Sequence, residues 1–362
     1  MKKIIIILIL IGFSISNVKA IDTTASAAIL LDADSNTVLY AKNIHNIRSV
    51  ASISKIMTAV LAIESGKLND TVIVDDTINT SYGSGIYIKS GEQIKLIDLV
   101  YGLMLRSGND AALMISKYVG GSVEDFVKMM NEKAKKLGMK NTIFNNPSGL
   151  DGSGIKGNYS TAYDMAILTS YAIKNDLYVQ ISSTKKYKVK TNLNYYSWTN
   201  KHKLLTSYKY AKTGKTGFTE IAKRTLVTTA TKNNMNLVVV TLNDGNDWED
   251  HVNLFEYGFS EYKKYKIIKK GNLNIIGEKH YKNYNLVSKN EFSYLLKKNE
   301  KDQVIIRFEL EKKRIYKDGD VAGKVNILLN DKVIYKDDIY IKKIEKTKTI
   351  FSIIKGWFKN DK

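Results

Sequence analysis

Hydrophobic and polar positions follow distinct patterns along the first part of the chain. Two apolar runs between residues 26 and 41 flank an Asp-Ala-Asp-Ser-Asn turn, which predicts a β-hairpin. Residues 54–63 then carry apolar side chains at helical spacing, and residues 96–119 and 123–137 show further helical patterns. The pattern therefore predicts strands first and a block of helices after them.

Strand patterns return in the second half of the chain. Residues 225–242 hold two β-rich runs on either side of Asn233-Asn234, which predicts a second hairpin, and one more helical pattern covers residues 250–259. A chain in which hairpins enclose a run of helices belongs to the α+β class. We therefore predict an antiparallel sheet with a helical cluster.

The composition changes after about residue 263. Alternating segments such as 304–310 and 325–330 are separated by Lys-Asp-Gly and Asn-Asp turns, which is typical of short antiparallel strands. This pattern predicts a small all-β domain over residues 263–345. None of the candidate motifs described below falls within it.

The two ends of the chain differ from the rest. Residues 1–20 combine Lys2 and Lys3, a short apolar run and a Val-Lys-Ala end, which is typical of a secretory signal peptide. The apolar run is about half of the roughly 20 residues that a spanning helix needs, so an uncleaved anchor is the weaker alternative. Residues 346–362 alternate apolar and lysine positions at helical spacing. This predicts an amphipathic membrane-anchor helix, with docking on the protein's own β domain as the alternative.

Charge and cysteine content narrow the possible functions. A formal net charge of +20 favours an anionic partner, such as nucleic acid, a membrane surface or an anionic polymer. Export argues against nucleic acid. The absence of cysteine excludes thiol catalysis and thiolate metal sites. The histidines, at positions 45, 202, 251 and 280, form no pair at helical ligand spacing, so we expect no metal and no cofactor.

The first motif with catalytic potential is Ser52-Ile53-Ser54-Lys55, at the start of an apolar helical segment. A serine and a lysine three positions apart on a helix share one face and lie within reach of each other. The same spacing recurs in this lysine-rich chain at Ser153, Ser182, Ser183, Ser260 and Ser352. Taken alone, the motif therefore fits a solvated surface pair better than a nucleophile with its base.

Two further motifs change that balance. Ser107-Gly108-Asn109 alone would be a turn that ends a helix, and Lys215-Thr216-Gly217 alone would be a polar turn into a strand. Together with Ser52-x-x-Lys55 they form, in this order, the motif set of penicillin-binding proteins and class A β-lactamases. The complete set favours the catalytic interpretation.

Longer stretches of the chain resemble one branch of these enzymes. The low-molecular-mass penicillin-binding proteins, which are serine-type D-alanyl-D-alanine carboxypeptidases, have similar sequences at residues 51–58, 98–112, 146–151 and 159–166. The resemblance covers about residues 26–262 and implies a transpeptidase-like catalytic domain over residues 21–262. The segments after it look like that family's C-terminal module and membrane anchor.

The resemblance also implies a function and a location. Such an enzyme is exported to the outer face of the bacterial cytoplasmic membrane and the cell wall. It removes the terminal D-alanine from peptidoglycan stem pentapeptides, and β-lactam antibiotics such as penicillin acylate it.

The matching positions then have the following expected roles. Ser52 is the nucleophile and Lys55, kept neutral by burial or a neighbouring cation, is the general base. Ser107 relays the proton, and Asn109 holds the substrate's peptide amide. The substrate-binding positions are Lys215 and Thr216 for the terminal carboxylate, Gly217 for close approach of the substrate backbone, and Phe218, whose N–H joins that of Ser52 as an oxyanion donor.

The chain departs from the family pattern at three places. Lys212-Thr213-Gly214 duplicates the third motif, and we predict that the second copy lines the site while the first lies in a loop, because Phe218-Thr219 and a β-rich run follow the second. His202 stands where the family often has an asparagine, and Ala222-Lys223-Arg224 replaces a more usual Ala-Gly pair. The changes at His202 and at residues 222–224 affect how the substrate is expected to be bound in detail.

Other functions remain as alternatives. A class A β-lactamase deacylates with a glutamate between the second and third motifs, but the chain has no glutamate between Glu132 and Glu220. A D,D-endopeptidase or transpeptidase would use the same acyl-enzyme chemistry. A non-catalytic wall-binding protein would keep the fold without an active serine, and the complete motif set argues against it.

Overall fold

The computed structural model describes residues 21–152, 154–275, 279–313 and 315–344. The predicted signal peptide at residues 1–20 and the predicted anchor helix at residues 346–362 lie outside these residues. Within the described ranges, no helix has both the length and the apolar character needed to cross a bilayer.

An antiparallel sheet with the strand order β2-β1-β11-β10-β9 forms the centre of the larger domain. Its strands are β1 Ala27–Asp32, β2 Val38–Lys42, β9 Ala211–Thr219, β10 Lys223–Lys232 and β11 Met235–Leu242. The N-terminal hairpin therefore joins the later strands through the pairing of β1 with β11. At the other end, β9 is an edge strand, so alternate backbone groups along it have no partner within this sheet.

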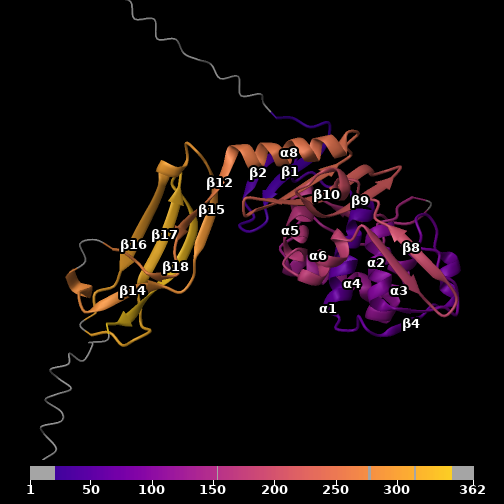
Figure 1. The fold of residues 1–362 in the computed structure, drawn as a ribbon, viewed down its shortest axis with the longest axis horizontal. Coiled ribbons are helices and arrows are strands. Elements are labelled where there is room, and N and C mark those ends of the chain that lie inside the picture. Colours follow the sequence, from indigo (N-terminus) through magenta and orange to yellow (C-terminus); the bar gives the residue numbers. More distant parts are fainter. Residues whose placement is uncertain (1–20, 153, 276–278, 314, 345–362) are drawn as a thin grey trace, which may run out of the picture.

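Helices cover both faces of this sheet (Figure 1). One face carries η1 Ala51–Ser54, α1 Lys55–Glu64, η2 Asp76–Thr80, α2 Leu96–Arg106, α3 Asn109–Gly120, α4 Val123–Lys136, α5 Ala162–Ala172 and α6 Asp176–Ser183. The short helix α7 Leu204–Ser207 lies between His202 and Tyr208, whose rings contact Trp248 and Phe255 of the last helix of this domain. The other face packs on α8 Asp247–Glu261. Alternate strand positions separate the two cores, since Ile29 and Leu31 pack toward the helical cluster and Leu30 packs toward α8.

Three small antiparallel pairs join segments of the helical domain. They are β3 Arg48–Ser49 with β6 Tyr159–Ser160, β4 Thr71–Ile73 with β5 Gln93–Lys95, and β7 Lys186–Lys190 with β8 Tyr195–Thr199. The β3–β6 pair matters for the site, because it joins the segment just before η1 to the segment just before α5.

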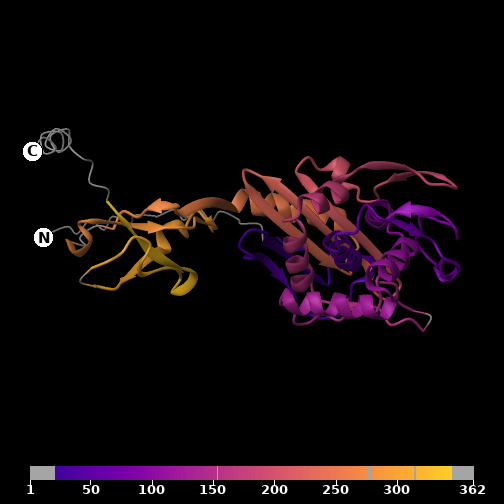
Figure 2. The same ribbon diagram turned by 90° about the horizontal axis from the view of Figure 1, so that it is seen from below.

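The C-terminal region is a separate β structure beside the larger domain, and the two form an elongated molecule (Figure 2). β12 Tyr262–Ile268 pairs with β15 Phe292–Lys297, and a second sheet has the order β13-β14-β18-β17-β16. Its elements are β13 Gly271–Asn272, β14 Tyr284–Ser288, β16 Val304–Leu310, β17 Val321–Leu329 and β18 Lys332–Lys343, with short turns η3 Lys279–Tyr281 and η4 Lys301–Gln303. Lys264 ties β12 to the first hairpin through an ion pair with Asp34 at 2.6 Å.

The α+β class, with a helical cluster on an antiparallel sheet and a small all-β region after it, is confirmed. The helical pattern over residues 96–119 is not one helix, because the chain breaks between α2 and α3. Ser107 causes the break by adopting a left-handed conformation with φ +63°. This break places the second motif at the junction of two helices.

Candidate active site

The first motif forms a contact pair at the start of α1. Ser52 lies in the tight turn η1 and Lys55 is the first residue of α1, so the three-residue spacing brings Ser52 Oγ within 3.0 Å of Lys55 Nζ. Ser52 is half-buried and lines a pocket, whereas Lys55 is completely buried behind it. A hydroxyl open to a ligand is thus in contact with an amine that solvent does not reach.

Two other segments hold the Lys55 amine. Its Nζ donates to Asn109 Oδ1 at 2.7 Å and to the Ser148 carbonyl oxygen at 2.6 Å. Asn109 Nδ2 donates to the Tyr82 carbonyl at 2.7 Å, which fixes the amide with its oxygen toward Lys55. A neutral amine has two N–H groups and one lone pair. With both N–H groups engaged, the lone pair is left for the Ser52 hydroxyl.

The surroundings favour that neutral state. Burial and, second, the positive charge of Lys215 hold the pKa of Lys55 well below its usual range, although the Asp110 carboxylate acts in the opposite direction. Burial, together with the nearby charge of Lys201, lowers the pKa of Lys215 to about 7. Burial and the charge of Lys215 therefore both favour the neutral form of Lys55, which a general base needs.

The second motif lies where α2 ends and α3 begins. Ser107 occupies the left-handed position that is usually glycine, which costs about 1 kcal/mol or more for a residue with a Cβ atom. Its side chain lines the same pocket as Ser52, and its hydroxyl has no hydrogen-bond partner among the described residues. Asn109 is the first residue of α3, and its amide N–H is bound to the Ser84 carbonyl at 2.7 Å.

The third motif lies inside β9. Lys215 is buried, with Nζ donating to the Thr216 carbonyl at 2.7 Å, while Phe218 is 57% exposed at the mouth of the pocket. Gly217 is needed for packing as well as for the predicted approach of substrate. A Cβ atom there would lie 2.3 Å from Thr225 Oγ1 and 3.0 Å from the Ser52 nitrogen. The missing side chain therefore lets β9 pack against the backbone of the nucleophile itself.

The pocket in front of Ser52 has a volume of about 310 Å³. It is lined by Ser52, Ser84, Ser107, Lys201, Thr216, Gly217, Phe218, Arg224, Thr225, Asp247 and Trp248. The structure thus adds Lys201 and Arg224 to the residues that the motifs predict, which gives the pocket two more cations. Arg224, noted in the sequence only as a departure from the family, is paired with Asp247 at 2.5 Å.

Lys55, Asn109 and Lys215 do not line the pocket and lie behind its wall. The structure therefore divides the predicted residues into two layers. Ser52, Ser107, Thr216, Gly217 and Phe218 face the space that a ligand would occupy, and the others surround the base. Among the described residues, no group of three or more His, Asp or Glu side chains could hold a metal ion.

The sequence predicted a loop for the first copy of the duplicated motif, and this prediction is wrong. Lys212-Thr213-Gly214 is the first half of β9, in the same strand as the second copy. The pairing of β9 with β10 is irregular at Lys212, between the pairs Thr213–Thr229 and Ala211–Ala230. Lys212 is exposed at this irregularity while Lys215 is buried beside Lys55, so only the second lysine can take part in the site.

His202 lies against the first copy of the motif. A Cβ atom at Gly214 would be 2.2 Å from His202 Nε2, so the imidazole occupies the space that this glycine leaves. Nε2 lies 3.1 Å from the Val227 carbonyl and 3.0 Å from Thr228 Oγ1. Burial lowers the pKa of His202 to about 4, so the ring is neutral at ordinary pH. It anchors the loop that carries Lys201 to the sheet.

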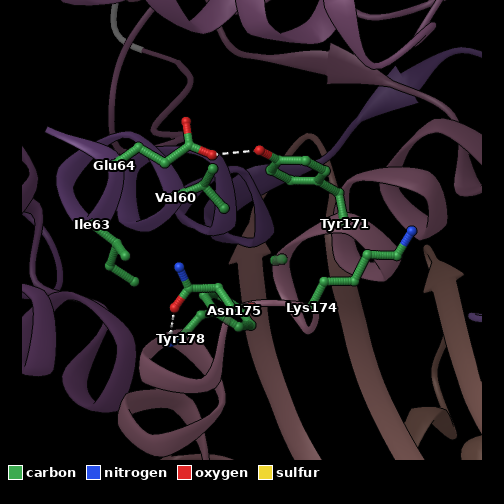
Figure 3. Close-up of a pocket in the computed structure, with 8 residues that line it drawn as sticks. Val60, Ile63, Glu64, Tyr171, Lys174, Asn175 and Tyr178 are labelled. Atoms are coloured by element: carbon green, nitrogen blue, oxygen red, sulfur yellow. Dashed lines mark hydrogen bonds between the residues drawn. The ribbon is translucent and has the colours of Figure 1, made fainter. Parts of the chain in front are cut away.

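A second pocket, of about 210 Å³, lies between α1, α5 and α6 and contains no residue of the three motifs (Figure 3). The acidic group at its edge is already bound, because Glu64 accepts a hydrogen bond from the Tyr171 hydroxyl at 2.6 Å and pairs with Lys133 at 2.8 Å. The arrangement around Ser52 is therefore the better candidate for chemistry.

Comparison with known proteins points to the same site. The model of the D-alanyl-D-alanine carboxypeptidase family matches residues 14–246, and that of the penicillin-binding protein 5 C-terminal domain matches residues 262–346. The D-alanyl-D-alanine carboxypeptidase DacF of Bacillus subtilis is 34% identical over 255 residues, which are 68% of this chain and 65% of that protein. DacB2 of Mycobacterium tuberculosis is 32% identical over 66% of this chain and 84% of its own. The chain thus spans slightly less than two thirds of the Bacillus relative.

Solved structures extend the similarity beyond the larger domain. Penicillin-binding protein 5 of Haemophilus influenzae has a TM-score of 0.75 and 28% identity over 90% of this chain and 98% of its own. The D-alanyl-D-alanine carboxypeptidase of Mycobacterium tuberculosis has a TM-score of 0.63 and 31% identity over 66% of this chain and 92% of its own. The first family model alone covers more than half of the 362 residues. The chain therefore belongs to the D-alanyl-D-alanine carboxypeptidase family, whose members include low-molecular-mass penicillin-binding proteins.

Proposed function

We propose that this protein is a serine-type D-Ala-D-Ala carboxypeptidase that removes the terminal D-alanine from peptidoglycan stem pentapeptides. Penicillin acylates the same serine. The observation that carries this proposal is the Lys55 amine, which is buried, has its N–H groups bound by Asn109 and Ser148, and lies 3.0 Å from Ser52 Oγ. Family membership supports the choice of substrate.

Acylation begins with proton transfer from Ser52 to neutral Lys55. The Ser52 oxygen then attacks the carbonyl carbon between the two D-alanines. The negative oxygen that forms accepts hydrogen bonds from the N–H groups of Ser52 and Phe218. One such donor contributes about 3 kcal/mol of transition-state stabilisation. Because β9 is an edge strand, its free backbone groups can pair with an extended peptide as another strand would.

Release of D-alanine requires a proton on its nitrogen, and in this proposal Ser107 relays that proton from Lys55. Its hydroxyl is free of partners within the described part of the chain and lines the pocket, so it can turn toward either group. Asn109 contacts the base through its side-chain oxygen, and in this proposal it also holds the peptide amide of the substrate, which requires it to exchange one of its present contacts with Lys55 or the Tyr82 carbonyl. Water then hydrolyses the ester by the reverse use of the same groups, which restores Ser52.

Positive charge around the pocket supports an exo-acting preference. Thr216 and Lys215 bind the terminal carboxylate in this proposal, Thr216 from the pocket lining and Lys215 through its charge from behind the wall, and Lys201 adds charge to the lining. A free carboxylate one residue beyond the scissile bond is what distinguishes a pentapeptide end from the middle of a peptide. One similar solved structure is that of a DD-transpeptidase of Streptomyces, and transpeptidation differs only in using an amine as acceptor in place of water.

Export follows from the same proposal. Residues 1–20 serve as the signal peptide, residues 21–262 form the catalytic domain and residues 263–345 a β-rich C-terminal domain. Residues 346–362 hold the protein at the outer face of the cytoplasmic membrane as an amphipathic helix. The family models, which match residues 14–246 and 262–346, support this division of the chain.

The test is mass spectrometry of a muropeptide pentapeptide incubated with the protein and, in parallel, with Ser52→Ala. We expect loss of one D-alanine with the unmodified protein alone, and a stoichiometric penicillin adduct that Ser52→Ala does not form. Transfer of the acyl group to an added amine, with little hydrolysis, would favour the transpeptidase. An unchanged peptide and no adduct on folded protein would refute the enzyme.

A further inference from the structure

A pocket of about 480 Å³ opens at the end of the central sheet, away from Ser52. It lies on the inner face of the sheet, between β9, β10 and β11 and the adjoining ends of α5 and α6. It shares no lining residue with the pocket in front of Ser52. Its volume falls within the range of about 300–1,000 Å³ that is typical of small-molecule sites.

The inner face of the sheet becomes polar at this end. Along β11 the inward positions Val240 and Val238 belong to the main core, but the next one is Asn236. The same change occurs along β10, where Val227 is followed by two inward threonines that line the pocket, Thr229 and Thr231. A buried sheet face does not need polar side chains for packing, so this change calls for another explanation.

These polar groups form a fixed array. Thr229 Oγ1 lies 2.8 Å from Thr213 Oγ1 and also accepts from the Thr213 backbone N–H. Thr231 Oγ1 donates to Asn236 Oδ1 at 2.9 Å. Thr213 and Thr229 are 1% and 3% exposed, so their positions are set by the strands rather than by solvent.

One hydroxyl at this pocket has no partner. Ser170, in the last turns of α5, lines the pocket and is 2% exposed, and its Oγ makes no hydrogen bond in the described part of the chain. A buried hydroxyl without a partner is destabilising, and such groups are usually satisfied by a bound molecule or water. The serine therefore points to an occupant that accepts or donates a hydrogen bond here.

The pocket also has two lysines that are not neutralised. Lys174 and Lys212 line it, and within the described ranges neither forms an ion pair. Figure 3 shows the Lys174 side chain extending away from Glu64, so that its ammonium group is not used by that carboxylate. The acid on the rim, Asp34, is itself paired with Lys264 at 2.6 Å.

We propose that this pocket is a second, non-catalytic binding site that takes a small organic anion, with a carboxylate or phosphate group held by Lys174 and Lys212. The hydroxyls of Ser170 and the inward threonines bind the polar remainder of the molecule. The site does not use Ser52 or Lys55, so it stands independently of the proposed reaction. Thr213 is two residues from Lys215 on one strand, and the catalytic and second sites are thus neighbours on β9.

The test is isothermal titration calorimetry of the full chain with N-acetyl-D-alanine and, separately, with inorganic phosphate. Penicillin is added beforehand to occupy Ser52, and acylation is checked by intact mass. The test variant is Lys174→Gln/Lys212→Gln, and the matched control is Lys135→Gln/Lys136→Gln, which removes the same charge from two exposed lysines of α4. A third protein, Ser170→Ala, removes the unpartnered hydroxyl.

We expect at least one of the two anions to bind the unmodified protein and the control alike. In the lysine double variant, the Kd of that anion should rise about tenfold or more, because charge-assisted contacts are lost. Ser170→Ala should weaken binding several-fold without loss of thermal stability, whereas a merely structural serine would leave binding unchanged. The relative strength of the two anions identifies which group the site prefers.

No binding of either anion to the unmodified protein, or equal binding by the double variant, would overturn the proposal. The two hypotheses fail in separate ways. If penicillin forms no adduct, the proposed catalytic function is in doubt, but the comparison of the lysine variants still tests the anion site in the pocket of about 480 Å³. If the adduct forms and the lysine variants bind as the control does, only the second site is lost.

Discussion

Substitution of Gly217 by alanine tests how closely the motif strand must approach the nucleophile. The new Cβ atom would lie 2.3 Å from Thr225 Oγ1, 3.0 Å from the Ser52 nitrogen and 3.2 Å from the Ile53 nitrogen. Ordinary contact begins at 3.4 Å, so the threonine contact alone requires a displacement of about 1 Å. Thr225 is 1% exposed and its hydroxyl is bound to the Val50 carbonyl, so it cannot easily turn aside.

The strand must therefore move away from η1, which widens the gap between the Ser52 and Phe218 N–H groups. A displacement of about 1 Å in a catalytic arrangement typically costs about 100-fold in rate. We expect Gly217→Ala to acylate with a fluorescent penicillin about 100-fold more slowly than the unmodified protein. The fold should survive, because the change is confined to the edge strand.

Two further variants separate the contacts. Gly245→Ala is the control for adding a methyl group, because nothing lies within 4 Å of its Cβ position, and it should acylate at the normal rate. Adding Thr225→Ala to Gly217→Ala removes the 2.3 Å contact but leaves the Ser52 one, so part of the rate should return. Normal acylation by Gly217→Ala would refute the idea that this glycine positions the strand.

Other predictions concern protonation, backbone strain and the tail. The acylation rate constant should rise with pH as Lys55 loses its proton and fall as Lys215, with its pKa near 7, loses its charge, so a pH-independent rate would contradict the roles of both lysines. Lys223→Gly should stabilise the protein by about 1 kcal/mol in urea unfolding, because Lys223 has φ +58°, and an unchanged midpoint would show that the turn is unstrained. Removal of residues 346–362 should release the protein from phospholipid vesicles without slowing pentapeptide hydrolysis, and continued sedimentation would argue that the tail is not the anchor.

The sequence predicted most directly the helix whose periodicity reflects a one-sided environment. Near residues 123–137, the buried Phe126, Met130 and Ala134 are separated by more exposed positions. The strand Ala27–Asp32 and the helix Lys55–Glu64 are buried at nearly every position, and their apolar runs, rather than an alternation of burial, indicated them. By contrast, α5 carries no such pattern, because buried side chains occur on all sides of it. A helix in the middle of a domain is apolar all round, and hydrophobic spacing cannot reveal it.

A local pattern also cannot predict which strands pair when they lie far apart in the sequence. Nothing in residues 27–32 indicates that β1 pairs with β11, whose residues are more than 200 positions away. The site shows the same limit. The spacing of Ser52 and Lys55 predicted their contact. The Ser148 carbonyl that binds Lys55, however, lies in residues 146–151, where the sequence shows only a similarity to the family and no contact with Lys55. Every residue has a backbone carbonyl, so a motif of residue types cannot predict which carbonyl binds the lysine.

Two of the chain's departures from its family pattern are one structural feature. The duplicated motif supplies Gly214, and the histidine that replaces the usual asparagine fills the space above that glycine. An imidazole is larger than an asparagine side chain, and here any Cβ atom at position 214 would overlap it. Because His202 directly follows Lys201, the pair fixes one wall of the pocket to the central strands. The extra glycine therefore accommodates a different way of holding the same wall, and it need not represent a second catalytic motif.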